Sequence, residues 1–365
     1  MNGPRLLIAA GGTGGHIFPA RAVAETLREA GWQIRLITDQ RGARHAAGFP
    51  GEGIDQIEAA TPFVKNPALA AGNTLRLARG FTAAGRIIAR FKPDLIAGFG
   101  GYPAFPALAH AQLKRIPFVI HEQNAVLGRV NRVFAARAFA VASGFDRLDR
   151  LPRKARHVVT GNPVRAAILA GGRTPYGAPE AECPIRLLVI GGSLGARILS
   201  AGVPEAIAGL PDALRARLEV TQQTRAEQID ASRRRYGEAG VTAICEPFFE
   251  DMAPLYARAH LVISRSGASS VSEIAALGRP SLLVPLEIAA DDHQRANAQG
   301  LAAAGAAQII TEDEIAGGAL RVRLESLLGD GEALGSMAEA ALQAGKPDAH
   351  LRLASLLQEA LDART

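Results

Sequence analysis

Two stretches decide the fold: "RLLIAAGGTGGH" (residues 5–16) and "RLLVIGGSLGAR" (residues 186–197). Each opens with Arg-Leu-Leu, continues as an apolar run typical of a buried strand, and ends in a Gly-Gly pair followed by a hydroxyl residue. A glycine turn between a strand and a helix is typical of nucleotide-binding units. Because the pattern occurs twice, about half a chain apart, the sequence predicts two Rossmann-like domains in tandem.

Strand-like runs alternate with amphipathic helical stretches along the whole chain, as in the helix expected over 19–31. This alternation predicts the α/β class, with a parallel, doubly wound sheet in each domain. Ligands of such sheets bind beyond the carboxyl ends of the strands, so we expect the two domains to face each other across a cleft. The expected bounds are 1–161 with about 346–365 for the first domain, and 162–345 for the second.

The composition is that of an ordinary globular protein, with 365 residues, 48% hydrophobic and 21% charged. No stretch resembles a signal peptide or a membrane span. The two cysteines, Cys183 and Cys245, lack metal-ligand spacing, and no Asp-x-Asp occurs. We therefore expect reduced thiols, no bound metal and no cofactor.

The net charge of +6 is distributed unevenly. Residues 1–161 carry 22 Lys and Arg against 10 Asp and Glu, while the remainder carries 19 against 25. No acid occurs over 59–93, and within this segment four arginines stand among Leu75, Leu77, Phe81, Ile87 and Ile88. Aromatic residues make up only 5% and no nucleic-acid-binding signature is present, which excludes nucleic acid as a partner. An anionic membrane surface is the expected partner, and a core helix with solvated arginines is the alternative.

The first glycine turn departs from the dinucleotide fingerprint, because Ile17 stands where a third glycine is required and His16 precedes it. An ordinary imidazole, with a pKa of about 6.5, suits a general base near neutral pH. His16 is therefore the first candidate for the catalytic base. The alternative is that His16 caps the helix or orients another base, such as Glu122.

Further polar segments follow predicted strands. "HEQN" (121–124) is a candidate site, because each of its side chains would need a buried partner in a core; a solvated loop is the alternative. "DDHQRANAQ" (291–299) reads as a polar binding loop or as a solvated helix start. Ser270 and Glu273 have the spacing of a capping box, although a carboxylate at Glu273 could instead hold a ribose.

The chain resembles the MurG family of bacterial peptidoglycan glycosyltransferases. The resemblance runs in unbroken order through "GGTGGHIFPA", "GFGGYPAFP", "HEQNAVLGRVNR", "GNPVR", "GGSLGAR", "FFEDM", "RSGASSVSEIAALGRPSLLVP" and "DDHQRANA". It implies two Rossmann-like lobes in the GT-B arrangement. It also implies an inverting hexosyltransferase that moves N-acetylglucosamine from UDP-N-acetylglucosamine to the muramyl 4-hydroxyl of undecaprenyl-diphosphate-linked MurNAc-pentapeptide (lipid I), forming lipid II.

The resemblance also implies roles for individual residues. Thr13, Gly14 and Gly15 are expected to face the diphosphate-sugar, and Asn124 is expected to contact the N-acetylglucosamine. Arg165 and Ser193 are expected to contact the diphosphate, and Gln294 is expected to contact the sugar hydroxyls. The main chain around Phe249 reads uracil, and Glu273 holds the ribose. The turn that holds the phosphates consists of Ala268, Ser269, Ser270, Val271 and Ser272.

The sequence departs from the family pattern at Leu194, at Ser269 and over 287–292. The resemblance implies a peripheral protein on the cytoplasmic face of the bacterial plasma membrane, with other proteins of cell-wall synthesis as further candidate partners. Two rival functions remain: an NAD-type oxidoreductase, disfavoured by the missing third glycine, and a non-catalytic sugar-nucleotide-binding or membrane-anchoring subunit, disfavoured by the intact polar loops.

Overall fold

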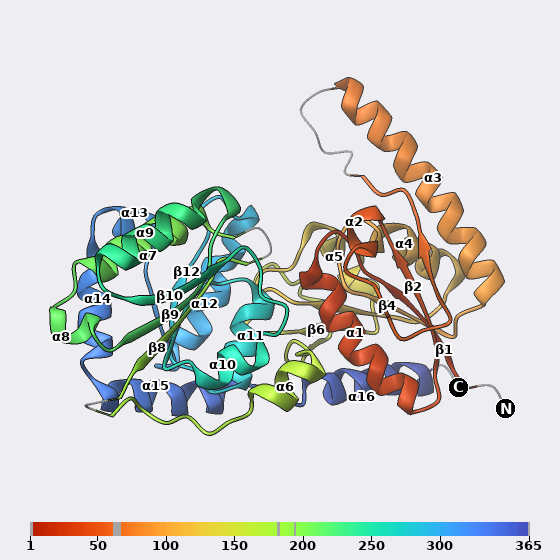
Figure 1. Ribbon diagram of the computed structural model, residues 1–365. Coiled ribbons are helices and arrows are strands. Elements are labelled where there is room, and N and C mark those ends of the chain that lie inside the picture. The colour runs from red at the N-terminus through yellow and green to blue at the C-terminus, as the bar shows by residue number, and fades with distance from the viewer. Residues whose placement is uncertain (1–2, 61–66, 181–182, 193–194, 364–365) are drawn as a thin grey trace. The chain divides into compact units, whose positions relative to one another are not determined.

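The computed structural model describes residues 3–60, 67–180, 183–192 and 195–363, and the chain divides into two compact units. Unit 1 comprises residues 1–165 and 348–365, and unit 2 comprises 166–347. Each unit contains one parallel sheet with helices on both of its faces (Figure 1). The α/β class with two doubly wound sheets, predicted from the repeated glycine turn, is confirmed.

Unit 1 has a seven-stranded sheet in the order β3-β2-β1-β4-β5-β6-β7. Its strands are β1 Arg5–Ala9, β2 Gln33–Thr38, β3 Gly53–Gln56, β4 Leu95–Gly98, β5 Phe118–Glu122, β6 Ala140–Ser143 and β7 His157–Val159. Its helices are α1 Gly14–Glu29, α2 Gln40–Ala43, α3 Pro67–Phe91, α4 Ala104–Lys114, α5 Arg129–Phe134, η1 Ala135–Arg137 and α16 Ala349–Asp362.

The alternation of side chains along β1 builds the two cores of unit 1. Leu6 and Ile8 point to one face, where they pack with α1 and α16, and Leu7 and Ala9 point to the other, where they pack with α3 and α4. Because both faces are covered, the strand is apolar from Leu6 to Ala9. Figure 1 shows α16 below the sheet of unit 1, although it comes last in the chain.

Unit 2 has a six-stranded sheet in the order β10-β9-β8-β11-β12-β13. Its strands are β8 Ile185–Ile190, β9 Leu218–Gln223, β10 Thr242–Glu246, β11 Leu261–Arg265, β12 Ser281–Val284 and β13 Ala307–Ile309. Its helices are α6 Ala166–Gly172, α7 Arg197–Ala208, α8 Asp212–Arg215, η2 Ala226–Gln228, α9 Ile229–Glu238, α10 Ala253–Arg258, α11 Ala268–Ala276, η3 Ala290–Asp292, α12 His293–Ala303, α13 Glu312–Ala316, α14 Ala319–Leu328 and α15 Gly331–Ala344.

Each sheet has one topological switch point. In unit 1 the chain winds outward from β1 through β2 to β3 and then restarts at β4 on the other side of β1. In unit 2 it winds from β8 to β10 and restarts at β11 beside β8. A crevice for a ligand forms outside the carboxyl ends of the two strands that flank such a point. The turns after β1, β4, β8 and β11 are therefore where binding residues are expected.

Helix α1 begins at Gly14 and not at Pro19, which lies inside it. Gly14 and Gly15 therefore belong to the helix itself, and as its first two residues their amides have no acceptor within the helix. A nearby anion can accept hydrogen bonds from such amides.

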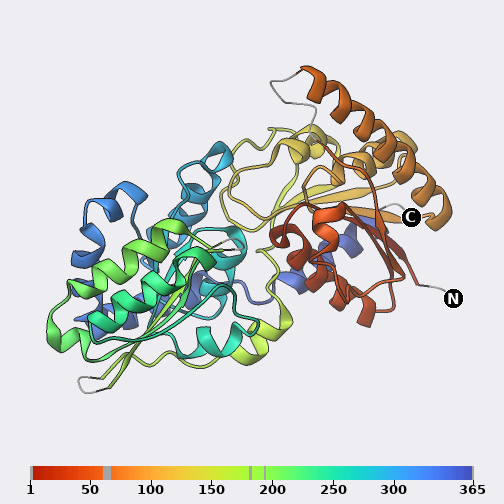
Figure 2. The ribbon, with the colours of Figure 1, turned by 45° about the horizontal axis from the view of Figure 1, so that its top comes forward.

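The second half of helix α3 contributes buried residues to the core, and the described side chains of its first half are mostly exposed. Ile87 and Ile88 are buried in the core of unit 1, so their expected place on a membrane-facing surface is wrong. Leu75, nearer the start of the helix, is 54% exposed, and this half of α3 stands away from the sheet (Figures 1 and 2). Within the residues described, no helix has both the length and the apolar character needed to span a bilayer.

Candidate functional site

The two glycine turns of the unit 1 switch point pack directly on each other. Gly101, after β4, has a φ of +75°, and a Cβ built on it would lie 2.6 Å from the carbonyl oxygen of Gly11, after β1. No residue with a side chain fits this backbone contact. The contact brings Gly100 against the start of α1, where His16 lies.

His16 lies half-buried at this switch point. Its Nδ1 is 3.4 Å from the Thr13 hydroxyl, and its ring covers Gly100, where a built Cβ would be 3.2 Å from Cδ2. Burial lowers the pKa of His16, and the charge of Arg41 acts in the same direction; Glu122, the Gly11 carbonyl and Asp39 oppose them. The ring is therefore neutral near neutral pH, the form in which an imidazole accepts a proton.

Glu122, at the end of β5, is 3% exposed and receives hydrogen bonds from four donors. Its Oε1 accepts from the Asn124 amide (3.1 Å) and side chain (3.2 Å), and its Oε2 accepts from the Gly128 amide (2.9 Å) and Asn131 Nδ2 (2.8 Å). Both oxygens thus tie down the segment that follows β5. Asn131 was not singled out from the sequence, because only the fold reveals that it reaches Glu122.

His121 and Gln123, the neighbours of Glu122, are also buried. His121 is 1% exposed; its Nε2 lies 3.2 Å from the Gly161 carbonyl oxygen, and Gln123 donates to its Nδ1 (3.2 Å) and to the Phe99 carbonyl (2.9 Å). Burial lowers the pKa of His121 to about 4. The solvated-loop alternative for 121–124 is therefore wrong, and Asn124 is the residue of the four with a partly exposed side chain.

Arg165, expected to contact a diphosphate, is the last residue of unit 1 before α6. Its guanidinium carbon lies 5.0 Å from the centre of the Phe18 ring, on the first turns of α1. The negative face of an aromatic ring attracts a cation and holds the guanidinium in place. Arg165 is therefore placed on the same helix start as Thr13, Gly14, Gly15 and His16.

At the unit 2 switch point, α11 begins at Ala268 after the N-cap residue Gly267, and no side chain caps its amides. The hydroxyl oxygens of Ser266 and Ser269 are buried, and neither has a hydrogen-bond partner in the part of the chain that the structure describes. Two unpaired hydroxyls beside a helix N-terminus suit an anionic ligand. Val271 is buried in the core, so only its main chain could contact a ligand.

Two more candidates, Ser270 and Ser272, lie on the same helix. Both are half-buried, and the main chain of Gly191, after β8, donates to Gln223 Oε1 at 3.1 Å. Ser193, expected to contact the diphosphate, lies outside the residues that the structure describes, as does Leu194.

Glu273 is not part of a capping box. Because α11 begins at Ala268, Glu273 lies in its second turn, where it is buried and accepts a hydrogen bond from the Tyr256 hydroxyl at 3.1 Å. The capping alternative is therefore wrong. Tyr256 on α10 carried no signal in the sequence, since nothing in its local pattern indicates a contact with α11.

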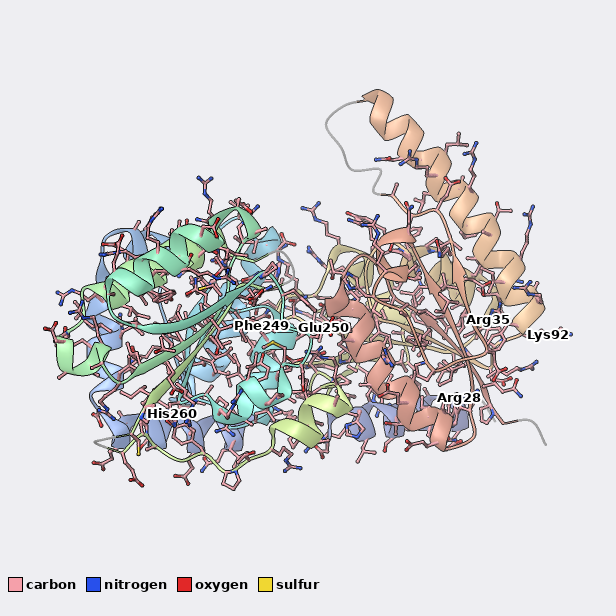
Figure 3. The ribbon with its side chains drawn as sticks, in the orientation of Figure 1. Arg28, Arg35, Lys92, Phe249, Glu250 and His260 are labelled. Carbon is pink, nitrogen blue, oxygen red and sulfur yellow. The ribbon has the colours of Figure 1, made fainter. Side chains whose placement is uncertain are left out.

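Gln294 and Phe249 follow the neighbouring strands. Gln294, in the first turn of α12, accepts a hydrogen bond from the Leu286 amide at 3.1 Å and so closes the loop after β12. That loop contains Asp291 and Asp292 in the left-handed region, with φ of 58° and 53°. Phe249 follows β10 and lies at the carboxyl end of the sheet, whereas His260 precedes β11 and lies at the amino end (Figure 3).

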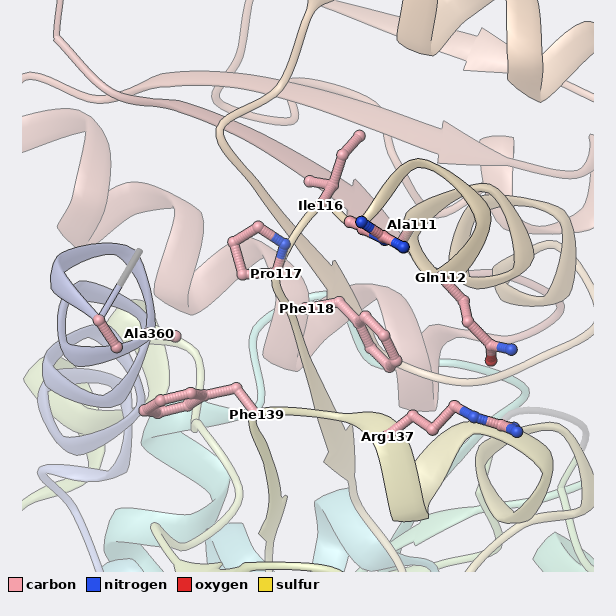
Figure 4. Close-up of a pocket in the computed structure, with 10 residues that line it drawn as sticks. Ala111, Gln112, Ile116, Pro117, Phe118, Arg137, Phe139 and Ala360 are labelled. Atoms are coloured by element: carbon pink, nitrogen blue, oxygen red, sulfur yellow. The ribbon is translucent and has the colours of Figure 1, made fainter. Parts of the chain in front are cut away.

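A cavity of about 430 Å³ lies elsewhere in unit 1, at the amino ends of β5 and β6. Its wall includes Gln112 and Phe118, with Arg137 and Phe139 on the other side (Figure 4). None of the candidate residues lines it. Because ligands of doubly wound sheets bind at the carboxyl ends, we do not assign the candidate chemistry to this cavity.

Both units match known protein families. Residues 6–143 match the glycosyltransferase family 28 N-terminal domain, and residues 186–353 match the glycosyltransferase family 28 C-terminal domain. The two matches together span most of both units.

Curated relatives are similar over nearly the whole chain. A UDP-N-acetylglucosamine–N-acetylmuramyl-(pentapeptide) pyrophosphoryl-undecaprenol N-acetylglucosamine transferase from Maricaulis maris is 56% identical, covering 96% of this chain and 95% of its own. A transferase of the same name from Mesorhizobium japonicum is 46% identical, covering 99% and 96%.

Among solved structures, MurG from Acinetobacter baumannii superimposes with a TM-score of 0.79 at 33% identity, covering 98% of this chain and 99% of that one. The kitacinnamycin glycosyltransferase superimposes with a TM-score of 0.70 at 17% identity, covering 99% and 100%, which shows a shared fold alone.

Proposed function

The chain belongs to glycosyltransferase family 28, and from this membership we infer that it transfers N-acetylglucosamine from UDP-N-acetylglucosamine to a lipid-linked N-acetylmuramyl-pentapeptide, forming lipid II. The observation that carries the inference is the 56% identity to a transferase of this name over 96% of the chain. The two rival functions, an oxidoreductase and a non-catalytic subunit, have no support among these relatives.

We propose that His16 is the general base of the transfer. The muramyl 4-hydroxyl oxygen forms a bond to the anomeric carbon as the bond from that carbon to UDP breaks, and the hydroxyl proton passes to the imidazole. Two observations support the assignment: the ring is held neutral, and it lies beside the amides of the first turn of α1. Glu122, the other candidate base, already accepts four hydrogen bonds and serves better as an anchor for Asn124 and Asn131.

For the donor, we propose that the start of α11 binds the diphosphate of UDP. The buried hydroxyls of Ser266 and Ser269, together with the uncapped amides of residues 268–270, would donate hydrogen bonds to phosphate oxygens. Glu273 would hold the ribose hydroxyls, and Gln294 those of the sugar. Arg165 and Ser193 remain proposed diphosphate contacts, Asn124 a proposed sugar contact, and the main chain at Phe249 a proposed uracil contact.

We further propose that unit 1 binds the cytoplasmic face of the plasma membrane through the exposed half of α3. Leu75 is exposed there, beside the exposed cations Arg76 and Arg79. Each cation near an anionic surface contributes about 1 kcal/mol, and the effect weakens as salt rises. Such a position would bring the protein to an acceptor that is itself anchored by an undecaprenyl chain.

The function is tested by incubating the full chain with UDP-N-acetylglucosamine labelled in the sugar and an undecaprenyl-diphosphate-MurNAc-pentapeptide acceptor. We expect the label to appear in a lipid-linked disaccharide, with one UDP released for each disaccharide. Omitting the acceptor is the control, in which UDP release should stay at background. Release of UDP and free N-acetylglucosamine without disaccharide would contradict the proposal.

A further inference from the structure

Asp39 is a buried carboxylate that joins the ends of two strands in unit 1. It follows β2, is 6% exposed and caps the short helix α2 by accepting from the Gly42 amide at 2.8 Å. The same oxygen, Oδ1, accepts from the Gly12 amide at 3.0 Å, in the turn after β1. A cap needs only the first of these contacts, so the second gives Asp39 a role beyond α2.

The contact with Gly12 determines the shape of the turn that carries His16. Gly12 has a φ of +87°, a conformation that only glycine adopts readily, and the Asp39 carboxylate holds its N–H toward the protein interior. The amides of the next residues, 13–15, lie at the start of α1, where backbone N–H groups have no acceptor within the helix. His16 follows directly, with its own amide bonded to the Thr13 carbonyl at 3.1 Å.

Arg41 places a positive charge over the same turn. Its Nε lies 3.4 Å from Asp39 Oδ2, and its Nη2 would lie 3.7 Å from a Cβ built on Gly12. The side chain is 68% exposed, so the long contact with Asp39 orients the guanidinium without burying it. An anion and a cation of one short segment therefore stand next to the histidine turn.

We propose that Asp39 is a positioning residue for the transfer reaction: its carboxylate holds the glycine turn that carries His16, and Arg41 balances the charge of that carboxylate beside the histidine. The proposal rests on the proposed function for the identity of the reaction. Nothing in the family resemblance assigned a role to either residue, since both lie outside the motifs that carry it.

The charged and titratable groups that face His16 come from two segments. Glu122 on β5 and Asp39 before α2 favour the protonated ring, as does the Gly11 carbonyl, while Arg41 on α2 opposes it. The neighbouring His121 is coupled to His16 by charge as well. Removing either member of the Asp39–Arg41 pair should therefore change the pKa of His16, and the two changes should have opposite signs.

The test uses three variants of the full chain: Asp39→Asn, Arg41→Gln and the control Arg44→Gln, which removes a positive charge from an exposed residue three positions beyond Arg41. The His16 imidazole is titrated by NMR in the free protein. We expect its pKa to fall by about 0.5 in Asp39→Asn, to rise by about 0.5 in Arg41→Gln, and to stay within about 0.2 in Arg44→Gln. Shifts of equal sign, or no shift in either of the first two, would overturn the proposal whether or not the protein transfers sugar.

A fourth variant, Asp39→Ala, tests the positioning itself, because it removes the acceptor that Asn retains. With the donor and the lipid-linked acceptor, we expect kcat to fall by about 10²-fold in Asp39→Ala and by less than about tenfold in Asp39→Asn, with any change in the KM for UDP-N-acetylglucosamine smaller than the fall in kcat. An equal loss in the two variants, or a loss confined to donor KM, would contradict the proposal. If Asp39→Ala fails to fold, the NMR titration of the other variants still decides the question.

Discussion

His16 is the residue on which the proposed chemistry depends. His16→Asn can keep a hydrogen bond to the turn but cannot take up a proton, so kcat should fall by about 10²–10⁴-fold while donor affinity changes by only a few fold. The acid limb of the pH–rate profile, which reports the loss of the neutral ring, should flatten in the variant. Steady-state kinetics from pH 5 to 9 provide the measurement. A variant that retains most of the wild-type kcat would make His16 a positioning residue.

The carboxylate of Glu273 has two candidate roles: it could hold the ribose, and it accepts a hydrogen bond from Tyr256. If Glu273 holds the ribose, Glu273→Gln should raise the KM for UDP-N-acetylglucosamine by about tenfold or more, because a charge-assisted hydrogen bond becomes a neutral one. Tyr256→Phe is the matched control: it removes the buried partner of Glu273 but no ribose contact, and should cost about 1 kcal/mol of stability with a smaller effect on KM. Equal effects of both variants on KM would show that the carboxylate acts through Tyr256.

His121 links stability to pH. Burial lowers its pKa to about 4 in the folded protein, while an unfolded histidine titrates near 6.5. Between these values the unfolded state binds more protons, so this stabilisation is complete above about pH 6.5 and is lost as pH falls toward 4. The difference corresponds to about 3 kcal/mol. His121→Gln should be less stable at pH 7 but should lose about that much less on acidification, as measured by urea unfolding at pH 7 and 4.5. Parallel losses in both proteins would be the contrary result.

At the scale of elements, α3 has two halves with different environments. Replacing the exposed Leu75 by Ser should weaken sedimentation with anionic vesicles by several fold and leave unfolding unchanged, because this side chain packs little in the folded protein. Val322→Ser, at an equally exposed position on α14 of unit 2, is the control and should not affect sedimentation. Equal binding of the wild-type protein to anionic and neutral vesicles would remove the membrane proposal.

At the scale of the whole molecule, α16 connects the end of the chain to the unit in which the chain begins. Leu357 of α16 is fully buried in the core of unit 1, and Leu327 of α14 is buried in that of unit 2. Leu357→Ala should lower the stability of unit 1 by about 2–5 kcal/mol, and Leu327→Ala should do the same to unit 2. In calorimetry, the two variants should shift different transitions, and UDP should raise the transition that Leu327→Ala lowers. If both variants shift a single shared transition, the units do not unfold independently.

The local pattern determined the architecture. The glycine turn after an apolar strand occurs twice, and together with the alternation of strand-like and helical stretches it predicted two doubly wound sheets. These patterns can be recognised locally, because the periodicities of strands and helices appear within short stretches of sequence. The resemblance through the ordered motifs also predicted the family, which the comparisons confirm.

Only the tertiary structure revealed the contacts between residues that are far apart in the chain. Spacing alone allowed Glu273 to be a cap, Ile87 and Ile88 to lie on a membrane-facing surface, and 121–124 to be a solvated loop as the alternative to a site; the packing of α10, α3 and β5 contradicts each of these. The bond from Gly12 to Asp39 and the four donors on Glu122 were equally hidden. The physical reason is that burial and hydrogen-bond partners depend on which elements pack together, and this information is not contained in any short window of sequence.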